Sequence, residues 1–460
     1  ILCKDVQSDA LVLIENQLEK TDHKHLGQLM TYASSQKTAY VVLAWWCFAA
    51  LTVGRAQIPE VTISKDSSGW TLLRHGETHP VLGAGAKANF ELLQSSGANS
   101  IRLWSTNKSA LLDSAHARGM SVMLGLYLRP ERTGMDYNDV HAVEGQLAEL
   151  KQEILKHKDH PALLLWGIGN EVDLQYTNTR VWDSVEALAE FIHQVDPHHP
   201  TSTVLAGIDP AKIHMVRTHC PNVDVLGVNA YGSIEKLPLN IRRFGWDKPY
   251  LVTEWGVNGP FEAPKTAWGA KKEPPGGVKA ATRLRRFKEI IAADSARCLG
   301  SYCFLWGQKQ ESTATWHGLF LSDGQPTDGV DAMHHAWTGE WPTTRAPGIV
   351  DLKLNGKGWR KDHVVQAGEV LRLEVEVEDH GAEVRWTCAL FPESTSTKTG
   401  GDRQASLTEV PASFEVSPGP VVEFTAPQQL GAYRVFVRAC NTTDQCSSAN
   451  LPLFVSARKN

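Results

Sequence analysis

The amino-acid sequence predicts an α/β protein, a (β/α)8 TIM barrel, followed by a small all-β sandwich. Short apolar runs alternate with segments of helical periodicity across residues 58–342, as is typical of the βαβ units of a parallel sheet. Two of the apolar runs end in glutamate, and the reactive side chains of a barrel stand at the carboxyl ends of its strands. Over residues 349–457 the helical pattern stops, and short runs alternate polar and apolar residues.

Length and composition set the broad class of the protein. A chain of 460 residues is too long for one ordinary domain, and 42% hydrophobic with 21% charged residues is an ordinary globular composition. The formal net charge of -5 provides no basic face for nucleic acid or for an anionic membrane. The 15 tryptophans are an excess, and sugar sites use flat aromatic faces. A neutral partner such as an oligosaccharide or polysaccharide suits this charge balance, and no nucleic acid is expected, although most of the tryptophans should belong to the core.

Residues 1–57 differ in character from the rest of the chain. The sequence begins with Ile1 rather than methionine, and residues 11–44 resemble a fragment of a bacterial nuclease-like domain, so we expect a leader or foreign fragment without activity. In residues 37–56, one basic residue, Lys37, precedes an apolar core that is too short for a stable membrane span, and the segment ends in the small-x-small pattern Gly54-Arg55-Ala56. This arrangement is typical of a secretory signal. This predicts a secreted or periplasmic protein, or a cytoplasmic one if segment 41–53 is not a signal.

The barrel elements follow in order. A strand or hairpin is expected over residues 58–80, around the turn cluster Lys65–Gly69. The expected barrel strands lie at residues 81–85, 100–104, 121–128, 163–169, 204–207, 223–231, 250–253 and 300–306. Helices are expected at residues 90–97, 109–119, 140–154, 181–195 and 283–293. A doubly wound open sheet would give a similar alternation, but no glycine-rich phosphate-binding pattern follows the first strand.

Two strand ends carry the expected chemistry. The apolar run after Pro161 ends in Asn170-Glu171, and the run after Pro249 ends in Glu254. A buried strand has no reason to carry such polar residues unless it ends at a functional surface. Cleavage of a glycosidic bond needs two carboxyl groups, one protonated and one ionised. A single glutamate at a strand end is as often a solvated loop residue as a catalytic one. Two such glutamates, each at the end of its own apolar run, favour a catalytic pair.

The motifs Gly169-Asn170-Glu171 and Thr253-Glu254-Trp255-Gly256 resemble the strand-four and strand-seven signatures of the retaining glycoside hydrolases of clan A, especially the barrel domain of the family-two type. The resemblance covers most of residues 70–341. It implies that Glu171 is the general acid/base and that Glu254 is the nucleophile.

The same resemblance implies roles for residues at other strand ends. Arg102 and Tyr231 would hold the nucleophile by hydrogen bonds, with an ordinary barrel salt bridge as the alternative for the arginine. Asn170 would bind the sugar 2-hydroxyl group, and Trp306 would form the floor of the first sugar subsite.

Further sugar contacts are expected from aromatic and polar loop residues. Trp104 and Trp316, together with Trp255 and Trp268, are candidate platforms, although a tryptophan at the top of a barrel is equally often plain packing. The polar segment Gln308–Trp316 follows the eighth strand and is a candidate for contacts that select the sugar. No spacing predicts a metal site, and no cofactor is expected.

The C-terminal part resembles an immunoglobulin-like β-sandwich, after a linker at residues 343–348. Strands are expected at residues 364–365, 370–377, 382–388, 421–425 and 431–440. Trp386 would be the core tryptophan, and Cys440 and Cys446 would close a hairpin disulfide in an exported protein. Structural support of the barrel is the expected role, with glycan binding as the alternative.

The sequence thus predicts a retaining β-glycoside hydrolase that acts on a β-glucan or β-glucoside by double displacement, with transglycosylation as an accompanying reaction. The preference for glucose rests on the resembled family. The alternatives are a catalytically silent glycan-binding barrel and a β-galactosidase-type or β-mannosidase-type specificity. Oligomeric state is not specified by these patterns.

Overall fold

The structure is a computed structural model, and it describes residues 2–4, 11–13, 60–378, 383–398, 401–412, 414–416 and 420–458. The chain separates into two compact units, Ile1–Gln57 and Ile58–Asn460. In the first unit, strands β1 (Leu2–Lys4) and β2 (Leu11–Leu13) pair antiparallel. The expected signal segment 37–56 and most of the nuclease-like stretch lie outside the described residues.

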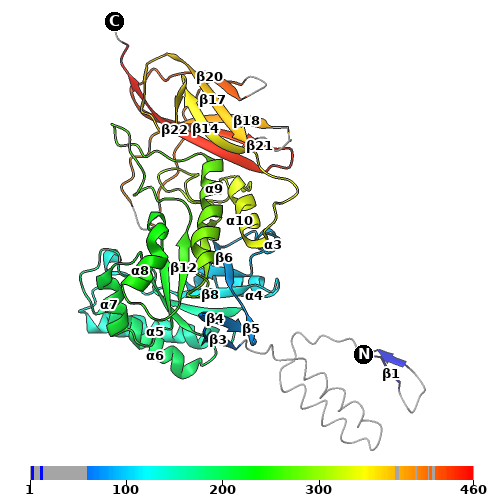
Figure 1. Cartoon of the computed structure of the whole chain (residues 1–460), viewed down its shortest axis with the longest axis vertical. Helices are drawn as coiled ribbons and strands as arrows, with labels where there is room; N and C mark the ends of the chain where they lie inside the picture. The colour runs from blue at the N-terminus through cyan, green and yellow to red at the C-terminus, as the bar shows by residue number, and fades with distance from the viewer. Residues whose placement is uncertain are drawn as a thin grey trace, which may run out of the picture. The chain divides into compact units, whose positions relative to one another are not determined.

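The predicted barrel is confirmed as a closed ring of eight parallel strands (Figure 1). The strands are β6 (Val81–Ala86), β7 (Ser100–Leu103), β8 (Ser121–Leu126), β9 (Leu163–Ile168), β10 (Thr201–Ala206), β11 (Val225–Asn229), β12 (Tyr250–Trp255) and β13 (Cys298–Trp306). The ring closes where β13 pairs with β6. Strands β8, β9 and β12 are buried at every residue, which explains their continuous apolar runs.

Helices cover the outside of the ring. They are α3 (Phe90–Ser95), α4 (Ala110–His116), α5 (Val140–His157), α6 (Val181–Val195), α7 (Pro210–His219), α8 (Leu237–Arg243), α9 (Gly276–Arg286) and α10 (Asp328–Thr338). Shorter turns are η2 (Thr106–Lys108), η3 (Glu131–Thr133), η4 (Gly232–Lys236), η5 (Phe287–Ile291) and η6 (Ala292–Asp294). None of the described helices combines the length and apolar character needed to cross a bilayer.

Two helices differ from the prediction: α7 was not expected, and α9 begins earlier than expected. Helix α7 was not predicted, although Asp209 caps it by accepting from the Lys212 amide and Pro210 occupies its first turn. Helix α9 begins at Gly276, before the predicted basic segment, and its two leading glycines pack closely against the sandwich. A Cβ atom at Gly277 would lie 2.9 Å from the carbonyl oxygen of Ile349.

A small sheet closes the amino end of the barrel. It consists of β3 (Val61–Lys65), β4 (Trp70–Arg74) and β5 (Glu77–Thr78). Leu72 of this sheet is buried in the apolar cluster that contains Leu165 and Leu251 from the barrel strands. The amides of Val61 and Trp70 bond to loop carbonyls at this end. The carboxyl end of the barrel is therefore the end where a site can form.

The C-terminal part consists of two sheets around one apolar core. The first holds β15 (Lys357–Gly358), β14 (Gly348–Leu354), β17 (Val370–Glu378), β20 (Val421–Thr425) and β19 (Phe414–Val416); the second holds β16 (His363–Gln366), β22 (Cys446–Ser456), β21 (Gly431–Cys440) and β18 (Arg385–Pro392). A disulfide joins Cys440 to Cys446. Trp386 is only partly buried at the edge of the core, whereas Trp359 is buried, so the expectation for Trp386 was wrong.

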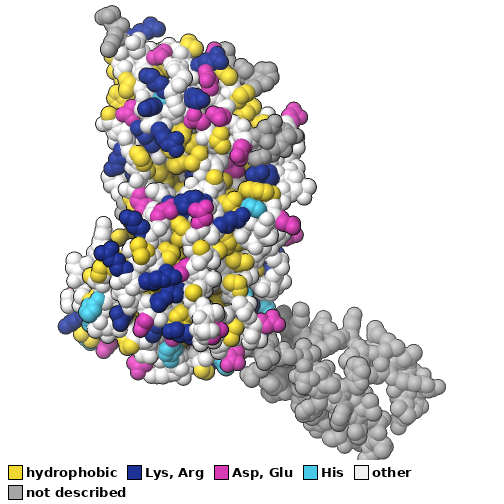
Figure 2. Space-filling view, viewed as in Figure 1, with side chains coloured by type: hydrophobic (Ala, Val, Ile, Leu, Met, Phe, Trp, Pro, Cys, Tyr) yellow, Lys and Arg dark blue, Asp and Glu magenta, His cyan; other side chains and the backbone are white. Residues whose placement is uncertain are grey.

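The surface of the second unit mixes charges of both signs. On the face drawn in Figure 2, lysine and arginine side chains are interspersed with aspartate and glutamate over the barrel and the sandwich. This face has no broad basic surface of the kind that binds a polyanion.

Candidate active site

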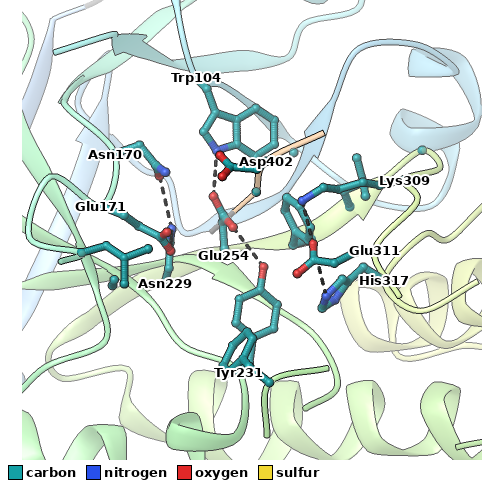
Figure 3. Close-up of a pocket in the computed structure, with 18 of the residues that line it drawn as sticks. Trp104, Asn170, Glu171, Asn229, Tyr231, Glu254, Lys309, Glu311, His317 and Asp402 are labelled. Carbon is teal, nitrogen blue, oxygen red and sulfur yellow. Dashed lines mark hydrogen bonds and ion pairs between the residues drawn. The ribbon is translucent and has the colours of Figure 1, made fainter. Parts of the chain in front are cut away.

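A pocket lies at the carboxyl end of the barrel strands (Figure 3). Its volume is about 900 Å³, which suits a small-molecule or sugar site. Both candidate glutamates line it, together with Trp104, Asn170 and Tyr231. Thus side chains from β12 and from the residues that follow β7, β9 and β11, distant in the sequence, meet in one place.

Glu171 reaches the pocket through an unusual backbone path after β9. Gly169 has a φ of +71°, and a Cβ atom there would lie 2.8 Å from Val172 Cγ1. Glu171 itself has a φ of 51°, a left-handed conformation that is uncommon for a residue with a side chain. The amide of Glu171 donates to the carbonyl of Val204 at 2.9 Å and anchors this turn on β10. The polar end of the strand is therefore held toward the pocket at a conformational cost.

The surroundings of Glu171 favour a protonated carboxyl group. Burial, followed by the charge of the neighbouring Glu254 carboxylate, raises the pKa of Glu171 to about 7. A hydrogen bond from Asn229 Nδ2 to Glu171 Oε1, 2.8 Å long, opposes this rise. Glu171 can consequently hold a proton near neutral pH and release it when the neighbouring charge disappears.

Glu254 stands in β12 and accepts three hydrogen bonds. Arg102 Nη1 and Trp104 Nε1 donate to Oε1 at 3.0 and 2.7 Å, and the Tyr231 hydroxyl donates to Oε2 at 3.0 Å. The residue is only 7% exposed. Burial, followed by the Glu254 charge, raises the pKa of Tyr231 well above its usual value, so its hydroxyl remains a donor. These donors suit an ionised carboxylate.

Arg102 joins the ends of several strands. It is 2% exposed and, besides Glu254, it donates to the Thr253 carbonyl at 2.7 Å and to Asn170 Oδ1 at 2.6 Å. Within the described part of the chain, Asn170 Nδ2 has no acceptor and is available to a ligand. The arrangement agrees with the expected positions of both residues.

Asn229 was not singled out from the sequence, and it links the two glutamates. Its Nδ2 donates to Glu171 and to Asn170, while its Oδ1 accepts from Thr253 Oγ1 at 2.9 Å and from Arg102 Nη1 at 3.3 Å. The residue ends β11, two positions before Tyr231. Its place as a polar residue at a strand end was the available signal.

Trp104 lies against the nucleophile candidate and forms an aromatic wall with Phe304. The two ring centroids are 5.9 Å apart, with the planes nearly perpendicular. A Cβ atom at Gly85 would lie 2.3 Å from Trp104 Cη2, so that glycine makes room for the indole. Trp104 therefore combines a ring surface with a polar contact to Glu254.

The expected role of Trp306 is contradicted. Trp306 borders the pocket, but it is 1% exposed, its Nε1 donates to the Asn89 carbonyl, and its ring packs against Phe320 and Trp337. A buried ring cannot form the floor of a sugar subsite. Phe304, on the same strand, lies beside Trp104 and lines the pocket instead.

The other tryptophans that were candidate sugar platforms, apart from Trp104, pack against other parts of the protein instead. Trp316 is fully buried and donates to the Asn258 carbonyl at 2.9 Å, and Trp255 is buried against Phe287. Trp268 packs on Phe454 of the sandwich. All three serve packing, as the alternative interpretation of such residues allowed.

The pocket wall includes groups from two segments that follow the barrel strands. Lys309, Glu311 and His317 come from the segment after β13. The first two lie in Gln308–Trp316, the segment expected to provide sugar contacts, and His317 follows it directly. Asp402 comes from the sandwich and lies 3.2 Å from Arg132 at the rim. Nothing local in the sequence around Asp402 indicates a position beside the barrel mouth. Among the described residues, no cluster of three potential metal ligands is found.

Comparison with known proteins agrees with this fold. The family model for the glycosyl hydrolases family 2, TIM barrel domain, matches residues 89–339. The chain is similar to a calcium-binding mutant of Bacteroides uniformis β-glucuronidase 2, at 14% identity and a TM-score of 0.46 over 86% of this chain and 48% of that chain. It is also similar to Eisenbergiella tayi β-galacturonidase bound to galacturonate, at 19% identity and a TM-score of 0.45 over 61% and 55% of the two chains.

A third similar structure is Bifidobacterium dentium β-glucuronidase complexed with coumarin-3-O-glucuronide, at 18% identity and a TM-score of 0.46 over 62% and 50% of the two chains. This chain spans about half the length of these three proteins. The family model is the finding that assigns the family, since it matches more than half of the 460 residues and includes both glutamates. The chain belongs to the glycosyl hydrolases of family 2 and contains their TIM barrel domain.

Proposed function

We propose that this protein is a retaining β-glycoside hydrolase that uses Glu254 as nucleophile and Glu171 as general acid/base. The observation that carries the proposal is the contrast between two carboxyl groups in one pocket. Glu254 accepts from a guanidinium, an indole and a hydroxyl group, whereas burial raises the pKa of Glu171 to about 7. Such a contrast divides the acid and nucleophile roles in glycoside hydrolysis.

In the first half of the reaction, Glu254 attacks the anomeric carbon while Glu171 donates its proton to the leaving oxygen. A glycosyl ester forms on Glu254, and the aglycone leaves as an alcohol. Esterification removes the negative charge that helped to raise the pKa of Glu171. Glu171 can then accept a proton from water, whose oxygen attacks the anomeric carbon and releases Glu254.

Transglycosylation follows the same route when a sugar hydroxyl group replaces water in the second half. A β-glucan or β-glucoside is our proposed substrate, on the strength of the resembled family. β-Galactoside, β-mannoside and, from the names of the similar structures, β-glucuronide and β-galacturonide are the alternatives that a substrate panel must include.

Product stereochemistry tests the proposal. Nitrophenyl β-glycosides of these sugars are incubated with the full chain, and the first-formed anomer is observed by proton NMR. Release of the β-anomer supports double displacement, whereas release of the α-anomer contradicts it. Saturable sugar binding without turnover would favour the catalytically silent barrel.

We also propose that the protein acts outside the cytosol. The disulfide between Cys440 and Cys446 supports this location, because disulfides persist in oxidising compartments. Expression of the full gene followed by assay of culture medium, periplasm and cytosol tests it. Activity confined to the cytosolic fraction contradicts it.

A further inference from the structure

The segment after β13 brings a third carboxylate to the pocket wall. Glu311 is 8% exposed, and its Oε2 accepts from Lys309 Nζ at 2.7 Å. Its Oε1 accepts no hydrogen bond from any described residue, and it is not among the fully enclosed polar atoms. Since Glu311 lines the pocket, this oxygen is available to a ligand. A largely buried carboxylate oxygen without a donor is costly unless a ligand or water satisfies it.

His317 lies beside this carboxylate and has no net charge near neutral pH. Its Nε2 is 3.9 Å from Glu311 Oε2, and the residue is 1% exposed. Burial, together with the nearby charge of Lys309, lowers the pKa of His317 well below its usual value. Its Nδ1 is enclosed and has no partner within the described residues. Lys309, Glu311 and His317, which we call the β13-loop cluster, therefore carry one positive and one negative charge in total.

The cluster is held rigidly. Glu311 and Thr313 exchange two backbone hydrogen bonds across Ser312, which has a φ of 61°. The amide of Ser312 donates to Gln404 Oε1 of the sandwich at 2.9 Å, and Thr313 Oγ1 donates to the buried Glu273 at 2.5 Å. A tight turn anchored on both sides keeps Glu311 in place before any ligand binds.

The cluster is also close to the reacting centre. The His317 ring centroid is 5.1 Å from that of Tyr231, whose hydroxyl donates to Glu254. In Figure 3, Glu171 and the β13-loop cluster lie on opposite sides of Glu254. The cluster therefore flanks the space over the nucleophile candidate, where the attacked sugar ring would sit.

Among the described residues, three basic side chains line the pocket. Two of them form ion pairs with carboxylates of the protein, and the third is exposed to solvent. Lys309 is paired with Glu311, and Arg132 is paired with Asp402 at the rim. Lys87 is exposed, 5.8 Å from the centre of the Trp104 ring. A second carboxylate beside Glu311 would thus meet a like charge without a dedicated cation, and such an arrangement is unfavourable.

We propose that Lys309, Glu311 and His317 form a hydroxyl-binding subsite that selects a neutral sugar ring and rejects a uronic acid. Glu311 Oε1 would accept from one sugar hydroxyl group, and Lys309 Nζ would donate to an adjacent one. A neutral ring supplies both a donor and an acceptor without adding charge, whereas a uronate would place its carboxylate against Glu311. This inference names the substrate class of the proposed hydrolase and rests on that function for the position of the ring over Glu254.

Binding of glycono-1,5-lactams, which carry no charge and keep the 2-hydroxyl group, to the full chain tests the subsite. Neutral compounds of gluco, galacto and manno configuration are compared by calorimetry with their 6-carboxylic acid forms. At least one neutral compound is expected to bind about tenfold more tightly than its acid form, or better. Equal or tighter binding of the acid forms to the wild-type protein, or no binding of any neutral compound, would overturn the inference.

Matched variants assign the effect to the cluster. Glu311→Gln is expected to weaken binding of the best neutral compound by about tenfold and to narrow its advantage over the acid form. Glu235→Gln is the control, because Glu235 pairs with Arg285 and Arg286 and does not line the pocket. If Glu311→Gln keeps the full preference for the neutral compound over its acid form, the inference is overturned. It is also overturned if the wild-type protein binds the acid form tightly and Lys87→Gln abolishes that binding.

These readouts separate the two proposals. Binding requires no turnover, so loss of the hydrolase proposal would show as absent cleavage while the preference for neutral compounds persists. If the subsite proposal is wrong, the protein would cleave uronides, or its preference for neutral compounds would not change in Glu311→Gln. The wild-type comparison needs no variant and remains decisive if Glu311→Gln does not fold.

Discussion

Glu171 and Glu254 carry the same side chain, and the barrel gives them different surroundings. Glu254 is surrounded by donors, including the buried guanidinium of Arg102, while Glu171 accepts one hydrogen bond, from Asn229. Burial and the Glu254 charge raise the pKa of Glu171 to about 7. Because a general acid must carry a proton, activity should be present below this pKa and fall as the pH rises through it.

Replacing Glu171 should remove that pH dependence. Glu171→Gln is expected to lower kcat/KM for an unactivated β-glycoside by about 10²- to 10⁴-fold, the usual contribution of general acid catalysis. A dinitrophenyl leaving group needs no proton, so formation of the glycosyl ester from such a substrate should be much less affected. Pre-steady-state release of dinitrophenol and pH profiles measure both effects. A wild-type descending limb near pH 7 that persists in the variant would contradict the acid role.

Asn229→Ala should shift the descending limb of the pH profile of kcat/KM to higher pH. The hydrogen bond from Asn229 lowers the pKa of Glu171, so its removal should raise that pKa and let Glu171 keep its proton to higher pH. The descending limb of kcat/KM is therefore expected to shift to higher pH. Thr203→Ala, a change of a buried strand hydroxyl that bonds to the Ile168 carbonyl, is the control. A shift to lower pH would contradict the assignment.

The site residues were predictable to the extent that local motifs mark strand ends. The structure brings Glu171, Glu254 and Tyr231 into one pocket, and Arg102 donates to Glu254, as their strand-end positions suggested. The aromatic floor was not predictable, because strand β13 changes register between Cys303 and Trp306. Where a strand is irregular, the alternation of side chains along the sequence does not report which aromatic ring faces the pocket.

At the scale of elements, the barrel depends on the contact between β13 and β6. Gly300 of β13 pairs with Val81 of β6 and has a φ of +122°. A Cβ atom at Gly300 would lie 2.2 Å from the Val81 carbonyl oxygen, where neither backbone can yield without opening the ring. The strand that supplies Phe304 to the pocket is thus tied to the point where the barrel closes.

Gly300→Ala should therefore destabilise the protein strongly. Positive φ and a backbone clash together are expected to lower the free energy of unfolding by at least about 3 kcal/mol. Gly339→Ala is the matched control, because Gly339 also has a positive φ, 84°, but no atom lies within 4 Å of its added Cβ. Its expected cost is about 1 kcal/mol. Urea unfolding followed by tryptophan fluorescence measures both, and equal costs would contradict the importance of the strand contact.

At the scale of the whole second unit, a buried polar network joins the sandwich to the barrel. Glu273 and Lys279 pair at 2.5 Å with 1% and 5% exposure, and Asn450 of β22 donates to Glu273 at 2.7 Å. Thr313, next to the β13-loop cluster, donates to the same carboxylate. The sandwich therefore supports the pocket wall through Glu273 as well as through Gln404.

Removal of one partner of the network tests this support. Glu273→Ala leaves Lys279 buried without its carboxylate and is expected to cost about 3 to 5 kcal/mol of unfolding free energy. Glu374→Ala removes an exposed partner of Arg372 on the sandwich and should cost less than about 1 kcal/mol. Calorimetric unfolding of both variants distinguishes the cases. Similar small losses would show that the network does not join the two parts.

The overall architecture was predictable where burial follows from the sequence pattern. The barrel strands read as apolar runs because helices cover them, and the expected order of strands is confirmed. Strand β22 was not predicted, because its Ser447 and Asn450 face the barrel and bond to Asp328 and Glu273, which interrupts the apolar alternation. Contacts between distant segments, such as Asp402 with Arg132, follow from how the parts pack and leave no local signal.

The most direct measurement is the identity of the residue that carries the trapped sugar. The full chain is incubated with dinitrophenyl 2-deoxy-2-fluoro-β-glycosides of the substrate panel, and peptides are sequenced by mass spectrometry. The fluorine slows hydrolysis of the ester more than its formation when the leaving group is activated. A single ester on Glu254 is the expected result. A label on Glu171 or Glu311, or turnover of the substrates without any ester, would contradict the assignment of the two carboxyl groups.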